Sequence, residues 1–167
     1  LDYMFRTAPT LVTGLKGHIV YYARPSATET DFTAILSAIR DSGAKIIIHV
    51  FSGEAGLAFI KQWGEMQVPA IPIGVNVLGQ ESDHWDKTAG ECEYETMLSS
   101  PPKVNISETT LPFWNKYVTK WGHDPMYTSF GTYDGILGLA EAIEDAGTLD
   151  SDAVVAEFEK SVRISTM

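Results

Sequence analysis

The part of the chain best suited to chemistry is a short polar turn, residues 52–56 with the sequence SGEAG, which follows an apolar run. A turn that opens a helix can present backbone N–H groups, together with the hydroxyl of Ser52, to an anion. This turn has only two glycines and no lysine, so it does not match the loops that bind nucleotide phosphates. We interpret it as a site for a small anionic or polar group, with Phe51 as an apolar wall and Asn76 as a second polar contact. The alternative is an ordinary strand-end turn without a ligand.

The other reactive side chains favour structural roles. His49 lies inside an apolar run, which favours a hydrogen-bonded core or pocket-edge histidine over a metal ligand. Residues 83–86 combine two aspartates with a histidine, but Trp85 interrupts them, so a solvated loop is favoured over a metal site. Cys92, the single cysteine, has no histidine at a recognisable spacing and is interpreted as a small buried apolar residue.

The composition fits a globular protein and excludes several functions. The 167 residues are 44% hydrophobic and 11% aromatic, enough to bury a core. A formal net charge of −10 argues against nucleic-acid binding, because affinity for phosphates comes mainly from Lys and Arg. No run approaches the roughly 20 apolar residues of a membrane span. Dinucleotide motifs, P-loops, zinc-protease motifs and nucleophile elbows are absent, so we expect no enzyme, catalytic residue, metal or cofactor.

The turn at Ser52 is positioned by alternating strands and helices. Apolar runs predict strands over residues 19–22, 45–51 and 70–75, and the continuous run at 45–51 predicts a strand buried on both faces. Between them, one helix is expected from a cap at Thr30 or Asp31 to Gly43, and another over about residues 54–66. This βαβαβ order predicts an α/β fold with a parallel, doubly wound sheet. The polar residues 52–54 and 76 then share the carboxyl edge of that sheet, where ligands bind in such folds.

The second half of the chain is mainly helical. After a polar stretch over residues 80–108, apolar stripes predict helices over 111–121 and 132–146, and Ser151 is the expected cap of a last helix. The aromatic side chains of Trp114, Tyr117 and Trp121 lie on one stripe, which we interpret as core packing rather than a ligand site.

Several short motifs, in order and spacing along nearly the whole chain, resemble the solute-binding proteins of branched-chain amino acid ABC transporters, the type I periplasmic binding proteins. The motifs are Phe5-Arg6-Thr7-Ala8-Pro9, Thr30-Asp31-Phe32, Ser42-Gly43-Ala44, Asp124-Pro125 with Tyr127, Tyr133-Asp134-Gly135, and the run from Ala140 to Gly147.

The resemblance implies two α/β lobes that close about a hinge on a small solute. It implies a hinge segment at residues 1–10, a C-terminal lobe at 11–125 and helices returning to the N-terminal lobe at 126–167. Between residues 5–10, which correspond to the exit from one domain, and the strand-like stretch 17–25, only residues 11–16 stand where a strand and helix of roughly 30 residues are expected, so we interpret the chain as partial. The candidate ligand-binding residues are Phe51, Ser52, Gly53, Asn76 and Tyr127.

The resemblance also implies partners and a location. The expected function is delivery of a small polar solute to the membrane permease of an ABC importer. The expected protein is periplasmic or extracellular, either free or membrane-anchored, and monomeric when full length. Amino-acid-binding members often carry a carboxylate where Asn76 stands, so a carboxylate or amide solute is as well supported as an amino acid. The alternatives are a ligand-sensing domain of a receptor or amide-responsive regulator, and a small doubly wound enzyme acting at Ser52.

Overall fold

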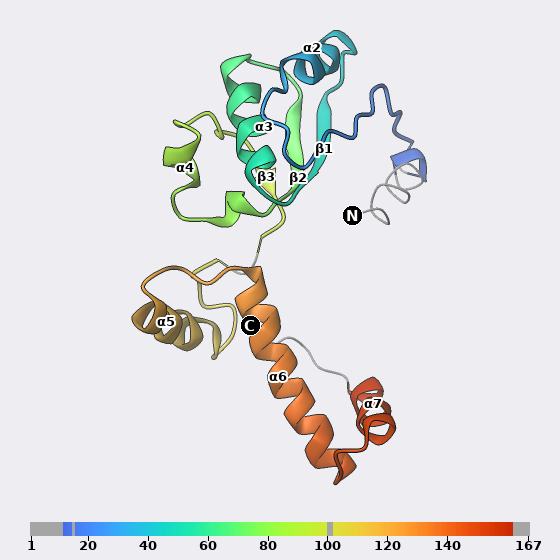
Figure 1. The fold of residues 1–167 in the computed structure, drawn as a ribbon, viewed down its shortest axis with the longest axis vertical. Coiled ribbons are helices and arrows are strands. Elements are labelled where there is room, and N and C mark those ends of the chain that lie inside the picture. Colours follow the sequence, from blue (N-terminus) through green and yellow to red (C-terminus); the bar gives the residue numbers. More distant parts are fainter. Residues whose placement is uncertain (1–11, 15, 100–101, 162–167) are drawn as a thin grey trace. The chain divides into compact units, whose positions relative to one another are not determined.

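The computed structural model describes residues 12–14, 16–99 and 102–161, and the chain divides into two compact units, Leu1–Leu98 and Ser99–Met167 (Figure 1). The predicted hinge segment at residues 1–10, with the first motif of the resemblance, lies outside the described residues.

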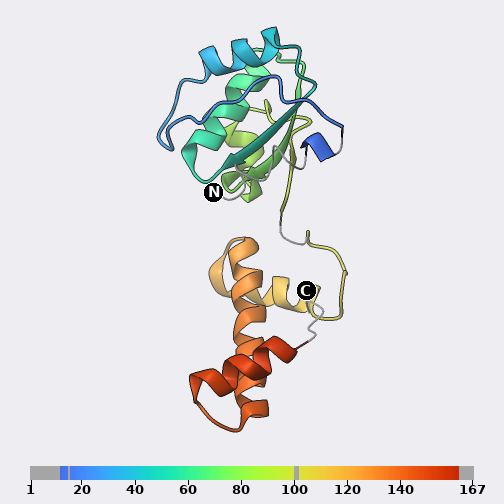
Figure 2. The same ribbon diagram turned by 90° about the vertical axis from the view of Figure 1, so that its right-hand side faces the viewer.

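The first unit is a parallel α/β sheet with helices on one face. Strands β1 (Ile46–Phe51), β2 (Ile71–Asn76) and β3 (Thr96–Met97) pair in that order, all parallel. Helices α2 (Thr33–Asp41) and α3 (Glu54–Glu65) pack against the sheet through a common apolar core (Figure 2). The predicted α/β class is confirmed, and β1, α3 and β2 begin and end within one residue of their predicted bounds.

The strand predicted over residues 19–22 is wrong. In the structure these residues form no strand, and Ile19, Val20 and Tyr22 are 47%, 56% and 59% exposed. Their residue types favour strands, but a strand also needs a hydrogen-bonded neighbour. Within the described residues, β2 is the only strand that pairs with β1, so the other edge of β1 is unpaired and residues 19–22 form no ladder with it.

The prediction that the second strand is buried on both faces is also wrong. Ile47 and His49 are 9% and 4% exposed, whereas Ile46 and Ile48 are 57% and 59% exposed. Successive side chains of a strand point to opposite faces, and the buried side chains of β1 belong to the face that α2 and α3 cover. The other face presents an isoleucine surface, made of Ile46, Ile48, Ile71 and Ile73.

Helix α2 is capped both by its own sequence and by a neighbouring helix. Phe32 stands at the N-cap position, but the predicted cap Asp31 accepts a hydrogen bond through Oδ1 from the N–H of Thr33, the first residue of the helix, at 3.0 Å. The side chain of Gln62 on α3 accepts a hydrogen bond from the Phe32 N–H at 2.7 Å and donates one to the Thr30 carbonyl at 2.7 Å. Asp31 and the amide of Gln62 together hold the start of α2, and Gly43 (φ +71°) ends it as predicted.

The chain returns from β2 to β3 through short helical turns. A 3₁₀ turn, η1 (Leu78–Gln80), is followed by α4 (His84–Lys87), and the chain then reaches β3 at Thr96. We call residues 77–95 the return segment.

The second unit is helical and has a smaller core. It contains α5 (Thr110–Trp121), α6 (Tyr127–Ala146) and α7 (Ser151–Lys160). Helix α6 begins five residues earlier than the predicted start at residue 132, and α7 is capped by Asp150, whose Oδ1 accepts from the Ala153 N–H at 3.0 Å, not by Ser151. Trp114 and Phe130 form the buried centre where α5 and α6 meet. In the described parts of the chain, no helix has both the length and the hydropathy needed to cross a membrane.

Candidate functional site

Four of the five predicted site residues gather at the carboxyl edge of the sheet. Phe51 ends β1 and Asn76 ends β2, and the two are direct partners in the parallel register. The Val77 N–H continues the pairing by donating to the Phe51 carbonyl at 3.1 Å. Ser52 is exposed and Gly53 half-buried between β1 and the start of α3. The sequence argument from parallel strand ends therefore placed these positions together correctly.

Two glycines shape this edge. Gly53 has φ +145° and ψ −164°, a conformation that residues with a side chain rarely adopt, and it turns the chain from β1 into α3. Gly56, in the first turn of α3, lies so close to the strand ends that a Cβ there would stand 2.5 Å from Asn76 Oδ1 and 2.8 Å from Phe51 Cβ. The absence of this side chain lets the N-terminus of α3 sit directly on the strand ends.

Phe51 forms a half-buried aromatic wall at the site. Its ring centroid lies 5.0 Å from that of Phe59, 5.8 Å from that of Phe32 and 5.8 Å from the imidazole of His49. These three ring contacts fix the orientation of the Phe51 ring. One side of the predicted site is therefore apolar and rigid.

Asn76 is buried, and its amide is used inside the protein. The residue is 0% exposed; its Nδ2 donates to Glu95 Oε1 at 3.0 Å, and its Oδ1 accepts from the Gly79 N–H at 3.3 Å. Because the side chain is fully buried, a solute could reach this amide only if the residues that cover it moved. The contact between Asn76 and a solute stays a prediction.

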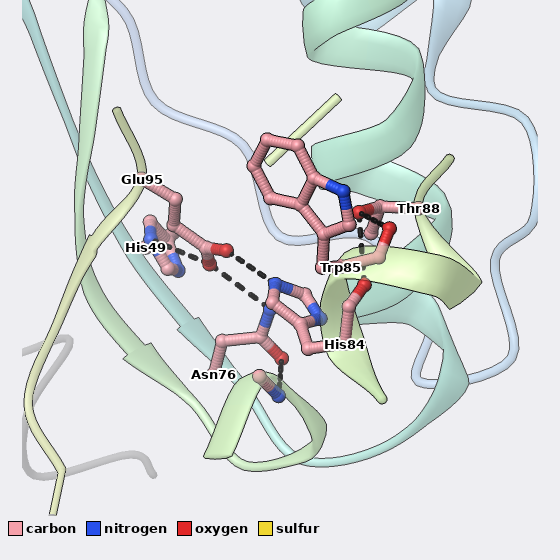
Figure 3. Close-up of polar contacts among 7 residues, drawn as sticks. His49, Asn76, His84, Trp85, Thr88 and Glu95 are labelled. Carbon is pink, nitrogen blue, oxygen red and sulfur yellow. Dashed lines mark hydrogen bonds and ion pairs between the residues drawn. The ribbon is translucent and has the colours of Figure 1, made fainter. Parts of the chain in front are cut away.

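Behind Asn76 lies a polar group that the sequence did not indicate (Figure 3). The Glu95 side chain is 1% exposed, and its two carboxylate oxygens lie 2.7 Å from His84 Nε2 and 3.8 Å from His49 Nε2. We call His49, Asn76, His84 and Glu95 the histidine–glutamate cluster. Its members come from β1, β2, α4 and the residue before β3, so no local spacing in the sequence could reveal them.

His49 is buried, as the core interpretation predicts, but the predicted hydrogen bond is missing. Neither ring nitrogen has a hydrogen-bond partner in the structure. Burial, the largest cause, lowers the pKa of His49, while the negative charge of Glu95 and the backbone of Val75 act in the opposite direction. His49 is therefore a neutral imidazole near pH 7.

The predictions for the other reactive residues have mixed outcomes. His84 does not lie on a solvated loop; it is 6% exposed within α4, because its ring turns inward to Glu95. Cys92 is half-buried and packs against the core of the first unit. Among the described residues, no three His, Cys, Asp or Glu side chains are arranged to hold a metal ion.

Tyr127 begins α6 in the second unit and is 46% exposed. Its contact with a solute that also contacts Ser52 stays a prediction, because Ser52 belongs to the first unit.

The aromatic stripe of α5 is only partly core. Trp114 is 8% exposed, as predicted for packing, but Trp121 is 57% exposed. With Phe113, Tyr117 and Tyr133, it lines an open groove of about 390 Å³ on the surface of the second unit.

Comparison with known proteins gives a family match over nearly the whole chain. Residues 4–167 match the family described as periplasmic binding protein. No curated protein sequence matches the chain.

Solved structures share the fold. A periplasmic ligand-binding protein of a branched-chain amino acid ABC transporter from Burkholderia xenovorans superposes with a TM-score of 0.76 at 22% identity, over 99% of this chain and 44% of its own. A leucine-binding protein from Thermotoga maritima gives 0.76 at 19% identity, over 91% and 43%. A solute-binding protein of an ABC transporter from Rhodopseudomonas palustris, in complex with 3,4-dihydroxybenzoic acid, gives 0.66 at 21% identity, over 89% and 42%. The chain thus spans less than half the length of each of these structures.

Proposed function

Because the chain belongs to the periplasmic binding protein family, we propose that it supplies part of an extracytoplasmic solute-binding protein that serves an ABC importer. Its role is to bind a small polar solute and present it to the membrane permease, without chemical conversion. In the full-length protein, which we propose to be a monomer, two lobes close about a hinge on the solute. Micromolar affinity corresponds to about −8 kcal/mol, which a closed cleft with a few polar contacts can provide.

The observation that supports a binding site in this chain is the open carboxyl edge of the sheet. The exposed hydroxyl of Ser52 and the backbone at Gly53 stand where α3 begins, beside the aromatic wall of Phe51. The N–H groups in the first turn of a helix attract negative charge. A carboxylate bound there would gain hydrogen bonds without needing a lysine or arginine.

The solutes of two structural neighbours suggest the same chemical class. Leucine and 3,4-dihydroxybenzoic acid differ in shape, yet each carries a carboxyl group. We propose that the solute of this protein is a small organic carboxylate, amino acid or not. In this proposal Ser52 and Gly53 hold the carboxylate and Phe51 covers its apolar part, and we keep Tyr127 as a further proposed solute contact.

For Asn76 we propose a positioning role beside any direct contact. Its Oδ1 holds the Gly79 N–H, and its Nδ2 holds Glu95, so the amide sets the course of the chain after β2. A solute at Ser52 would rest against a strand end that Asn76 keeps in place.

Binding is tested by calorimetry and thermal melting with matched pairs of carboxylates and amides. The purified chain is titrated with leucine, leucinamide, 3,4-dihydroxybenzoate and 3,4-dihydroxybenzamide. We expect a carboxylate to raise the melting temperature while its amide does not; at 100 times Kd the stabilisation is about 2.7 kcal/mol. If a folded chain responds to neither member of any pair at millimolar concentration, this proposal is wrong for the chain by itself.

The site is tested with Ser52→Ala and a matched control, Ser82→Ala, at another exposed serine of the first unit. Losing a hydrogen bond to a charged group costs about 1.5–3 kcal/mol, so S52A should weaken binding of the active carboxylate at least tenfold. S82A should bind as the wild type does. Equal affinities for S52A and S82A would remove Ser52 from the site.

A further inference from the structure

The histidine–glutamate cluster ties both ends of the return segment to the sheet (Figure 3). At the start of the segment, Gly79 donates its N–H to Asn76 Oδ1. At its end, Glu95 accepts from Asn76 Nδ2 at 3.0 Å and lies 2.7 Å from His84 Nε2. One buried carboxylate therefore joins β2, α4 and the approach to β3.

His49 lies under this arrangement as a buried base with no hydrogen bond. Neither its Nδ1 nor its Nε2 makes a hydrogen bond, and the Glu95 Oε1 that faces Nε2 is 3.8 Å away, too far for one. The imidazole instead stacks on the ring of Phe51 at 5.8 Å and lies 6.3 Å from that of Phe59. Such surroundings disfavour a charged ring, and burial lowers the pKa of His49 below its ordinary value of 6.5.

The charged groups around His49 are few. Glu95 and His84 face it from the return segment, and β2 contributes only the neutral amide of Asn76. From α3 the ring of Phe59 faces it, while the charged side chains of that helix are exposed. The remaining charges of the return segment include Lys87, which pairs with Glu81 and Asp83 at the surface. These surface groups keep their solvent whether the segment is closed or open.

We propose that the histidine–glutamate cluster is an acid-sensitive latch, which holds the return segment closed at neutral pH and releases it on acidification. In the closed form, His49 is shielded from water and stays neutral. When the segment opens, water reaches the ring, and the ring binds a proton with its ordinary affinity. Acid therefore favours the open form by mass action.

The direction and size of the effect follow from proton linkage. The open form binds more protons than the closed form below the ordinary histidine pKa of about 6.5. The closed form is thus fully favoured above that pH and loses its advantage as the pH falls. Each proton taken up on opening raises the opening equilibrium constant by up to about tenfold per pH unit.

The latch shares residues with the candidate solute site. Phe51 stacks on His49, and Asn76 bonds to both ends of the return segment, so opening would disturb the wall and the strand end that a solute contacts. Release of solute at acidic pH would follow, a consequence that rests on the proposed function. The latch itself does not.

The latch is tested without solute by amide hydrogen exchange, read by mass spectrometry on the purified chain at pH 7.5, 6.5 and 5.5. After correction for intrinsic exchange rates, we expect protection within residues 77–95 to fall about tenfold between pH 7.5 and 5.5. Protection in α2, which contributes no residue to the cluster, should stay constant. Unchanged protection of residues 77–95 over this range would overturn the proposal.

Two variants assign the effect to His49. His49→Phe keeps an aromatic ring beside Phe51 and Phe59 but cannot bind a proton, so its residues 77–95 should show little dependence on pH. His18→Gln removes an exposed histidine of the same unit and should behave as the wild type. Equal loss of protection in wild type and H49F would overturn the proposal. Should H49F not fold, the NMR titration of His49 Hε1 in the wild type decides, and a pKa above the ordinary 6.5 would refute the latch.

Discussion

Adjacent residues of β1 differ sharply in how much of their side chains is buried. Ile47 is 9% exposed and belongs to the core with Phe32, Leu36 and Phe59, while Ile48 is 59% exposed on the isoleucine surface. Both side chains are isoleucines, so the difference in their exposed fractions arises only because one face of the sheet is covered and the other is not.

We expect Ile47→Ala to lower the free energy of unfolding by about 2–4 kcal/mol, because it removes buried methyl groups and leaves a cavity. Ile48→Ala should change the free energy of unfolding by only about 0.5 kcal/mol. Urea unfolding followed by circular dichroism measures both. If I48A is as destabilising as I47A, the isoleucine surface is covered in solution by something outside the described residues.

The same pair of residues shows what the sequence could not predict. A continuous apolar run correctly predicts a strand, but it does not say which face is covered, since that depends on where helices pack. In the candidate site, Phe51 and Asn76 were predictable because parallel strands end at one edge. Glu95 was not, because it reaches Asn76 from 19 residues away through the return segment, and nothing in its local pattern marks it as buried.

At the scale of elements, the close packing of α3 on the strand ends depends on a glycine, Gly56. Gly56 in α3 is buried against Asn76 and Phe51, whereas Gly135 in α6 has no atom within 4 Å of the position of a Cβ. Both glycines lie within helices, where alanine has the higher helix propensity by about 1 kcal/mol.

Gly56→Ala and Gly135→Ala should therefore change stability in opposite directions. G135A gains helix propensity at no steric cost and should stabilise the second unit by about 0.5–1 kcal/mol. G56A should destabilise the first unit by about 1–3 kcal/mol, because the new methyl group pushes α3 away from the strand ends. Local stability from hydrogen exchange within each unit measures both changes. A stabilising G56A would mean that α3 does not sit as close to Asn76 as the structure shows.

Element bounds were predictable where they depend on local chemistry. The glycines after α2, α5 and α6 end these helices with positive φ, as their sequence positions indicate. The start of α2 was predictable only in part, since Asp31 accepts from the Thr33 N–H as its position indicates, but Gln62 of another helix also holds the Phe32 N–H. The segment over residues 19–22 has strand-forming residues but no paired neighbour, and so the strand prediction failed there.

At the scale of the whole chain, the two units differ in the size of their cores. The first unit buries a continuous cluster of apolar residues from α2, β1, α3 and the loop before β2. The second unit buries Trp114 and Phe130 between α5 and α6, with Ala142 and Val154 buried on α6 and α7. The alternation of strands and helices predicted the α/β class of the first unit. It could not predict how much apolar surface each unit buries, because that depends on how the elements pack.

We therefore expect the amides of β1, β2 and α3 to exchange at least about tenfold more slowly than those of α5, α6 and α7. An amide exchanges slowly when the opening that exposes it also exposes a buried apolar core to water, because such an opening costs free energy. The second unit has a smaller apolar core, so its opening costs less. Hydrogen exchange of the intact chain at pH 7.5, where the proposed latch is closed, measures both units in one sample. Trp114→Phe reduces the core of the second unit, so it should speed exchange in α5 and α6 and leave exchange in β1 unchanged. If the helices of the second unit are as well protected as β1, buried contacts beyond those of Trp114 and Phe130 stabilise them.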